Sequence, residues 1–262
     1  MKKFLLIFAV FATAVAIYGS LHSLHFCNRA NTGQDTLINY KLGETEVTIN
    51  YKNFRNTGGV AYIILHDDEN TAVEATDSVI ADNGSAMIEI QAKGTRDIKF
   101  RLNGAVFAFD PNRIFTPVGV AKTLRNYGKT SPEAEKTVGD FGVFLISLLE
   151  KYDTVVAVHN NKRGYSLKDY LPGAAYQNDA EEVFWDKETS PNDFFFVVER
   201  DDFEALKEKG FNVVLQAPAS VTDDGSLSVY CQQKGLRYFN CEAFEGNLKK
   251  QIEMLRALSG AE

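Results

Sequence analysis

Residues 60–69 read Val60-Ala61-Tyr62-Ile63-Ile64-Leu65-His66-Asp67-Asp68-Glu69, an unbroken apolar run that ends in one histidine and three acidic residues. Such a run is typical of a strand that is covered on both faces of a sheet. A second run, Thr154-Val155-Val156-Ala157-Val158, is followed in the same way by His159. Because ligands bind just beyond the carboxyl ends of strands in open α/β sheets, we expect both histidines at the binding edge of one sheet.

The rest of the chain alternates between short strands and helices. Period-two alternation and apolar runs predict further strands over residues 46–51, 87–90, 98–102, 106–109, 194–198, 213–215, 227–230 and 237–241. Helices are expected over residues 71–83, 132–152, 201–209 and 246–258. These elements predict an α/β fold with a mixed, largely parallel sheet flanked by helices. No repeat or low-complexity tract demands a further domain, so residues 35–262 are expected to form a single domain.

The first 26 residues have the composition of an export signal. Met1-Lys2-Lys3 is a short positive segment, and residues 4–16 form an almost unbroken apolar stretch with small residues near its end. Such a stretch is short for a membrane-spanning helix and typical of a secretory leader. We therefore expect an exported protein, periplasmic or secreted. The alternative is an uncleaved N-terminal anchor, in which case only this segment would meet the membrane.

Composition narrows the class of partner. The 262 residues carry a net charge of −7, which disfavours a nucleic-acid binder because such proteins normally present a basic surface. Hydrophobic residues make up 45% and charged residues 24%, which is ordinary for a globular protein and argues against disorder.

The three cysteines leave the redox state open. Cys27 follows Leu24-His25-Phe26, whereas a lipid-attachment site normally has small residues at those positions, so lipidation is not expected. Cys231 and Cys241 lie at the ends of two expected strands. They could pair in an oxidising compartment, or they could remain two buried thiols.

His66, Glu69 and His159 form a candidate metal site. A histidine and a glutamate three residues later can converge on one zinc ion, and histidine is the commonest metal ligand. The last four-fifths of the chain contains only these two histidines. The turn-forming pair Asn160-Asn161 would present His159 at an edge. Three protein ligands leave an open position, as in catalytic zinc sites. The alternative is that both histidines are structural.

Two further strand ends carry groups suited to hydrolysis. Arg113 offers a rigid fork of donors that can hold a carboxylate, and Asn112 could add a donor beside it. The alternative is a surface arginine paired with Asp110. Glu242 could take a proton from a zinc-activated water and pass it to a leaving amine. It could instead be an ordinary strand-end residue, and Glu245 lies close to it in sequence.

The chain resembles the zinc carboxypeptidase superfamily over roughly residues 58–245. The motifs that carry the resemblance are, in order, His66-Asp67-Asp68-Glu69, Asp110-Pro111-Asn112-Arg113-Ile114-Phe115, His159 and Glu242. The D-x-N-R-x-F pattern is similar to the succinylglutamate desuccinylase and aspartoacylase branch. The resemblance implies Zn²⁺ held by His66, Glu69 and His159. It also implies Glu242 as general base and acid, and Arg113, assisted by Asn112, on a substrate carboxylate.

Some positions differ from that family's pattern. Asp67 stands where the family's H-G-x-E usually has glycine. The family often has an oxyanion-stabilising arginine shortly before the Asn–Arg pair, and Arg101 is the nearest candidate, within an expected strand. A substrate-contacting tyrosine has three candidates, Tyr165, Tyr230 and Tyr238.

The leading hypothesis is an exported zinc-dependent amide hydrolase, a carboxypeptidase acting on peptides or cell-wall peptides that carry a free carboxylate. A second hypothesis is a deacylase of small N-acyl amino acids. A third is a non-catalytic module that binds a carboxylate-bearing ligand in the same cleft. The sequence leaves the exact substrate and the oligomeric state open.

Overall fold

The computed structural model describes residues 33–54, 59–162 and 164–259, and the chain from Gly33 to Glu262 forms one compact unit. The predicted export signal and Cys27 lie outside the described residues. Within the described ranges, no helix is long and apolar enough to cross a membrane.

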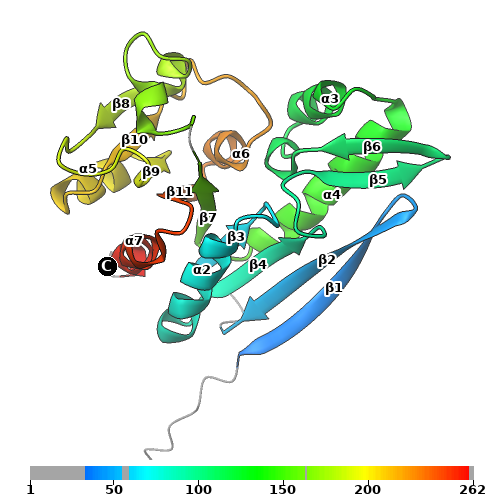
Figure 1. Ribbon diagram of the computed structural model, residues 1–262, viewed down its shortest axis with the longest axis horizontal. Helices are drawn as coiled ribbons and strands as arrows, with labels where there is room; N and C mark the ends of the chain where they lie inside the picture. The colour runs from blue at the N-terminus through cyan, green and yellow to red at the C-terminus, as the bar shows by residue number, and fades with distance from the viewer. Residues whose placement is uncertain (1–32, 55–58, 163, 260–262) are drawn as a thin grey trace, which may run out of the picture. The chain divides into compact units, whose positions relative to one another are not determined.

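In the described part of the chain, nine strands form one sheet in the order β1-β2-β4-β3-β7-β11-β9-β10-β8 (Figure 1). Their bounds are β1 (Gln34–Leu42), β2 (Thr45–Asn53), β3 (Val60–Ile64), β4 (Ala86–Gln91), β7 (Thr154–Asn161), β8 (Ala180–Phe184), β9 (Phe194–Val197), β10 (Val213–Gln216) and β11 (Arg237–Phe244). The central strands β4, β3, β7 and β11 run parallel, whereas β2 and β9 pair with them antiparallel. The predicted mixed, largely parallel α/β sheet is confirmed.

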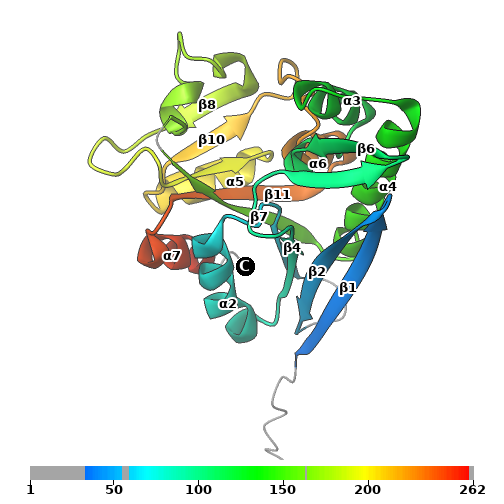
Figure 2. The same cartoon turned by 45° about the vertical axis from the view of Figure 1, so that its right-hand side comes forward.

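Helices cover both faces of this sheet (Figure 2). They are α2 (Asn70–Asn83), α3 (Pro117–Asn126), α4 (Pro132–Leu149), α5 (Arg200–Glu208), α6 (Leu227–Lys234) and α7 (Leu248–Ser259). One apolar core lies under α2, α5 and α7, and the other lies under α3, α4 and α6. The antiparallel ribbon of β5 (Ile98–Leu102) and β6 (Ala105–Phe109) adds to the second core.

The run at residues 60–64 is apolar throughout because its side chains enter both cores. Ala61 and Ile63 pack into the core under α4, and Tyr62 and Ile64 pack into the core under α2. Burial on both faces of residues 61–64 leaves no position among them at which a polar side chain would reach water, which is why alternation is absent.

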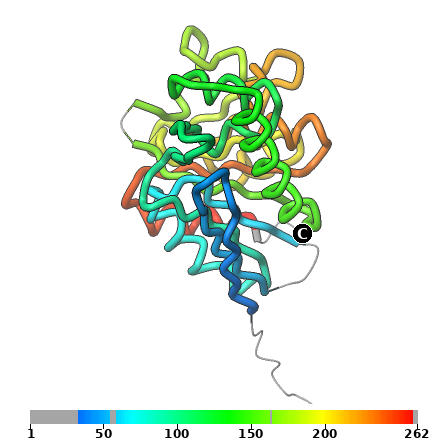
Figure 3. The backbone as a smooth tube through the Cα atoms, turned by 90° about the vertical axis from the view of Figure 1, so that its right-hand side faces the viewer, coloured from blue at the N-terminus to red at the C-terminus, as the bar shows by residue number. Residues whose placement is uncertain are grey.

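The β1–β2 hairpin forms one edge of the sheet (Figure 3). Its Tyr40 ring lies 4.9 Å from the ring of Phe141 and 4.8 Å from that of Phe144, both on α4. These contacts attach the hairpin to the helix that covers the second core. No sequence pattern predicted β1, α3 or β8.

Two sequence-based expectations are wrong. Residues 227–230 form the start of helix α6 instead of a strand. Leu227 and Cys231, four residues apart, enter the same core, as expected of one helix face. The pair Asn160-Asn161 continues strand β7 instead of turning, because distant polar groups satisfy both side chains within the fold. Cys231 and Cys241 are buried free thiols.

Candidate metal centre and cleft

The proposed site forms where three neighbouring parallel strands end. Strand β7 lies between β3 and β11 and pairs with both of them in parallel. His66 follows β3, His159 lies near the end of β7, and Glu242 is the register partner of His159 on β11. The topology thus brings together residues that are far apart in the sequence.

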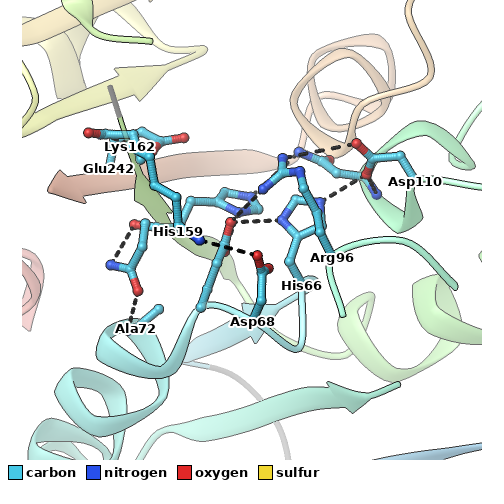
Figure 4. Close-up of polar contacts among 12 residues, drawn as sticks. His66, Asp68, Ala72, Arg96, Asp110, His159, Lys162 and Glu242 are labelled. Atoms are coloured by element: carbon cyan, nitrogen blue, oxygen red, sulfur yellow. Dashed lines mark hydrogen bonds and ion pairs between the residues drawn. The ribbon is translucent and has the colours of Figure 1, made fainter. Parts of the chain in front are cut away.

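His66, Glu69 and His159 form a compact buried cluster. Nδ1 of His66 lies 2.9 Å from one carboxylate oxygen of Glu69, and Nδ1 of His159 lies 2.9 Å from the other. The candidate ligand atoms all lie within 4.8 Å of one another. His66 is 0% exposed, Glu69 2% and His159 3%. Figure 4 shows both imidazoles directed into this cluster.

Surrounding residues fix the orientation of these groups. Nε2 of His66 lies 2.9 Å from Oδ1 of Asp110 (Figure 4), and that same oxygen accepts the backbone N–H of Asn112 at 2.8 Å. A carboxylate on the far nitrogen of a histidine holds the ring so that its other nitrogen can bind a metal. On β7, the backbone carbonyl of His159 accepts a hydrogen bond at 2.9 Å from the side chain of Gln251 on α7.

The charges in the cluster depend on one another. Burial opposes a charged imidazole, but Glu69 and Asp110 outweigh it and raise the pKa of His66 to about 9. Burial also opposes a charged Glu69, yet the two imidazoles hold the pKa of its carboxyl well below the usual range. A buried carboxylate is stable only beside positive charge. Two imidazoles and a carboxylate are also zinc ligands, so the donor set fits a divalent zinc ion.

A cleft of about 530 Å³ opens beside this cluster, and Glu69 and His159 form part of its wall. Asn112 and Arg113 lie in its lining, at the end of a 3₁₀ turn (Pro111–Arg113) that follows β6. Nε of Arg113 forms its ion pair with Asp224 at 3.2 Å, so its partner is not Asp110. The carbonyl oxygen of the Asn112 side chain accepts the backbone N–H of Leu227 at 3.1 Å, which fixes that side chain at the cleft.

Glu242 lines the same cleft and is 6% exposed. Its two carboxylate oxygens accept hydrogen bonds from the amides of Asn240 at 3.2 Å and Asn161 at 3.3 Å. Burial raises its pKa above the ordinary value. Glu245, the neighbouring candidate, is exposed and pairs with Lys162 at 3.4 Å. Of these two glutamates, only Glu242 lines the cleft, next to His159.

Arg96 is a residue of this site that the sequence analysis missed. Its Nη1 donates to Glu69 at 3.0 Å, and its Nη2 lies 4.0 Å from Asp110 (Figure 4). Arg101, the candidate taken from the sequence, is exposed on β5. Arg96, five residues before Arg101, is thus the arginine that contacts Glu69.

Asp67 holds the backbone of the loop that carries Arg96 to the site. Its Oδ2 accepts the backbone N–H groups of Ala92 at 2.6 Å and Gly94 at 2.5 Å. Both belong to the loop between β4 and β5 that carries Arg96. The carboxylate of Asp67, next to the candidate ligand His66, thus anchors the loop whose Arg96 contacts the candidate ligand Glu69.

Tyr165 and Tyr238 line the cleft, whereas Tyr230 packs against the core under α4. The hydroxyl of Tyr165 lies 2.6 Å from that of Tyr170, which also lines the cleft together with Tyr176. The structure removes Tyr230 from the three candidates for contacting a substrate. It adds two tyrosines, Tyr170 and Tyr176, that no motif indicated.

No protein-family model matches the chain, and no curated protein matches it. Among solved structures it is similar to thrombin activatable fibrinolysis inhibitor, at 12% identity over 93% of this chain and 72% of that one, with a TM-score of 0.48. It is also similar to a protein described as a metallopeptidase from Shewanella denitrificans OS217, at 13% identity over 94% and 88% of the two chains, with a TM-score of 0.41. A protein from Shewanella amazonensis SB2B, assigned to the succinylglutamate desuccinylase/aspartoacylase family, shares 10% identity over 85% and 72%, with a TM-score of 0.40.

Proposed function

We propose that this chain is a zinc-dependent amide hydrolase that acts next to a free carboxylate, as a carboxypeptidase does. The observation that supports it is the meeting of a two-histidine, one-glutamate cluster with Glu242 and Arg113 in one cleft. His66, Glu69 and His159 would hold the ion. When bound, zinc would supply Lewis-acid chemistry, which polarises a carbonyl and lowers the pKa of water.

The chain's own residues supply the remaining functions. Glu242 takes a proton from the attacking water and returns it to the leaving amine, because it is the buried carboxylate beside His159. Arg113 and Asn112 hold the substrate carboxylate and so set which bond reaches Glu242. Arg96 points its guanidinium at Glu69 and lines the cleft, so it can donate to oxygen that becomes negative in the transition state.

The expected export signal would place this activity on peptides or cell-wall peptides. A small N-acyl amino acid offers the same carboxylate and the same amide to the site, so it is the competing substrate. Zinc-loaded protein should be assayed on short peptides and on N-acyl amino acids side by side. Turnover of N-acyl amino acids alone would reassign the protein as a deacylase, and turnover of neither would contradict the proposal.

Peptides with a free terminal carboxylate are expected to be cleaved with a higher kcat/KM than the same peptides as terminal amides. The expected ratio is about 10- to 100-fold, because a hydrogen bond to a charged group is worth about 1.5–3 kcal/mol. In Arg113→Ala the ratio should fall to near unity, mainly through a higher KM for the free peptide. Arg101→Ala removes an exposed arginine from β5 and serves as the control. An unchanged ratio in Arg113→Ala would remove Arg113 from carboxylate binding.

Zinc uptake by the metal-free protein is expected to strengthen with pH. Below about pH 9 His66 holds a proton that zinc must displace, so the affinity should rise about tenfold per pH unit and level off above that value. Without metal, the raised pKa of His66 contributes stability below its ordinary value of 6.5, and this is lost as pH rises through about 9. Chelator competition across this range measures the first effect and thermal unfolding the second. In Asp110→Asn the affinity should level off at lower pH, and a flat profile in the wild type would disprove the linkage.

Replacing Asp67 by glycine should loosen the loop that carries Arg96. We expect kcat to fall about tenfold with KM little changed, less than the ~10²–10³ that losing an oxyanion donor costs. Amide hydrogen exchange at Ala92 and Gly94 should accelerate in Asp67→Gly and stay slow in Asp186→Ala. Asp186 likewise accepts a backbone N–H, from Glu188 at 3.0 Å, but lies outside the cleft. Unchanged exchange in Asp67→Gly would show that the loop is held by other contacts.

A further inference from the structure

Two amide side chains in the cleft have carbonyl oxygens without a hydrogen-bond partner. Oδ1 of Asn240 and Oε1 of Gln216 are buried atoms that accept no hydrogen bond in the described part of the chain. Gln216 is 1% exposed, and both residues line the cleft. Buried polar atoms are nearly always paired with protein, water or ligand, so two such oxygens in one cleft indicate a place for donors brought from outside.

The orientation of both amides is fixed by their nitrogen atoms. Nδ2 of Asn240 donates to Glu242 at 3.2 Å. Nε2 of Gln216 donates to the side-chain oxygen of Gln232 at 2.8 Å and to the backbone oxygen of Ser228 at 3.4 Å. Turning the amide of Gln216 over would face its oxygen toward the backbone oxygen of Ser228, and turning that of Asn240 over would face its oxygen toward a carboxylate oxygen of Glu242. Each side chain therefore presents a fixed acceptor.

Strand β9 lies between the two strands that carry these acceptors. Asn240 on β11 is the register partner of Phe196 on β9, and Phe196 is the partner of Val214 on β10. Gln216 stands two residues after Val214, just beyond the last residue of β10 that pairs with β9, and it lines the same cleft as Asn240. Phe196 lines the cleft between them.

Residues 224–228 contact both Gln216 and the pair that would bind a carboxylate, Asn112 and Arg113. Ser228 accepts from Gln216, the N–H of Leu227 donates to Asn112, and Asp224 pairs with Arg113. Ser228, which contacts Gln216, and Asp224, which contacts the guanidinium of Arg113, are thus only four residues apart in this segment. A residue bound by its carboxylate at Arg113 would lie in the cleft that both acceptors line.

We propose that Gln216 and Asn240 select a carboxylate-bearing residue whose side chain ends in N–H donors, an amide or an ammonium group. The inference rests on the proposed function only in using Arg113 to hold the carboxylate. An apolar side chain would leave both oxygens unpaired, and a carboxylate side chain would set acceptor against acceptor. The cleft therefore discriminates among residues of equal size by hydrogen-bond donors.

The test compares peptides that end in glutamine, glutamate or methionine, and a second pair that ends in lysine or norleucine. With the zinc-loaded wild type, we expect kcat/KM for glutamine to exceed that for methionine and for glutamate at least about tenfold, and lysine to exceed norleucine. In Gln216→Met the glutamine-to-methionine ratio should fall below about threefold. Gln233→Met, on the exposed side of α6, should keep the wild-type ratio. Equal rates for glutamine and methionine in the wild type would overturn the proposal.

A binding measurement separates this inference from the proposed function. Calorimetry with the free amino acids should show glutamine binding to the zinc-loaded wild type at least about tenfold more tightly than methionine. If no peptide is cleaved but this preference holds and disappears in Gln216→Met, the hydrolase proposal fails and the pocket stands. Should Gln216→Met not fold, Gln216→Glu keeps the shape and adds charge, and should shift the preference toward lysine. A Gln216→Glu protein with the wild-type preference would overturn the assignment.

Discussion

His66→Ala is expected to lose its zinc, while the wild type retains about one ion per chain after dialysis. The substitution removes one of three ligands and leaves a two-ligand site, and it also takes the hydrogen-bond partner from Asp110. Asp110→Asn, which keeps every ligand and weakens only the support of His66, should cost about 10- to 100-fold in zinc affinity. Metal content and chelator competition measure both variants.

The control for this experiment is Asp153→Ala. Asp153 accepts the backbone N–H of Gly59 at 2.8 Å, directly before β3 and β7, and so lies at the opposite ends of the strands that carry the ligands. Its loss should leave zinc content unchanged. Zinc should raise the melting temperature of the wild type and of Asp153→Ala but not that of His66→Ala, because a ligand stabilises only the state that binds it. Wild-type zinc affinity in His66→Ala would show that His66 is not a ligand of the zinc ion.

The candidate metal site could be predicted from the sequence because His66 and His159 each follow an apolar strand. Burial on both faces makes β3 and β7 visible as unbroken apolar runs, and parallel strands bring their carboxyl ends together. His66 and His159 could therefore be placed at one edge before their contacts were known. Glu69 followed from its spacing to His66.

The misses have a different origin, because they depend on contacts between residues distant in sequence. Asn160-Asn161 favours a turn locally, but Asn160 donates to Gln251 and accepts from the backbone of Ala72, which keeps the pair in β7. Arg96 enters the site on a loop whose backbone N–H groups at Ala92 and Gly94 donate to the distant carboxylate of Asp67. No local pattern contains this information.

Helix α6 shows that four residues of sequence are too few to distinguish a strand from a helix. Leu227, Val229 and Cys231 are all buried, so a four-residue reading finds the alternation of a strand. In the fold, Leu227 and Cys231 enter the core while Val229 lines the cleft, so two separate surfaces create that alternation. The burial of Val229 in the cleft, on a different side of the helix from the core, therefore imitates the alternation of a strand.

Glu242→Gln is expected to lower kcat by about 10²–10⁴ while zinc content and KM change little. Glutamine keeps the shape of the side chain, and its carbonyl oxygen can still accept from one of the two asparagines, but it cannot take up a proton at neutral pH. Steady-state kinetics and metal analysis on the same preparation measure both quantities. Glu245→Gln, an exposed neighbour on the surface, should retain wild-type turnover.

Together with His66→Ala, this variant separates the three hypotheses for the chain. A hydrolase loses turnover in both variants but loses metal only in His66→Ala, because Glu242 contributes chemistry and no ligand. A non-catalytic binding module would show no turnover to lose, and its affinity for a carboxylate ligand would depend on Arg113 and survive Glu242→Gln. Full turnover in Glu242→Gln with zinc bound would show that a group other than Glu242 transfers the proton. Burial raises the pKa of Glu242 and so favours its protonated form, which is the form that must donate to the leaving amine.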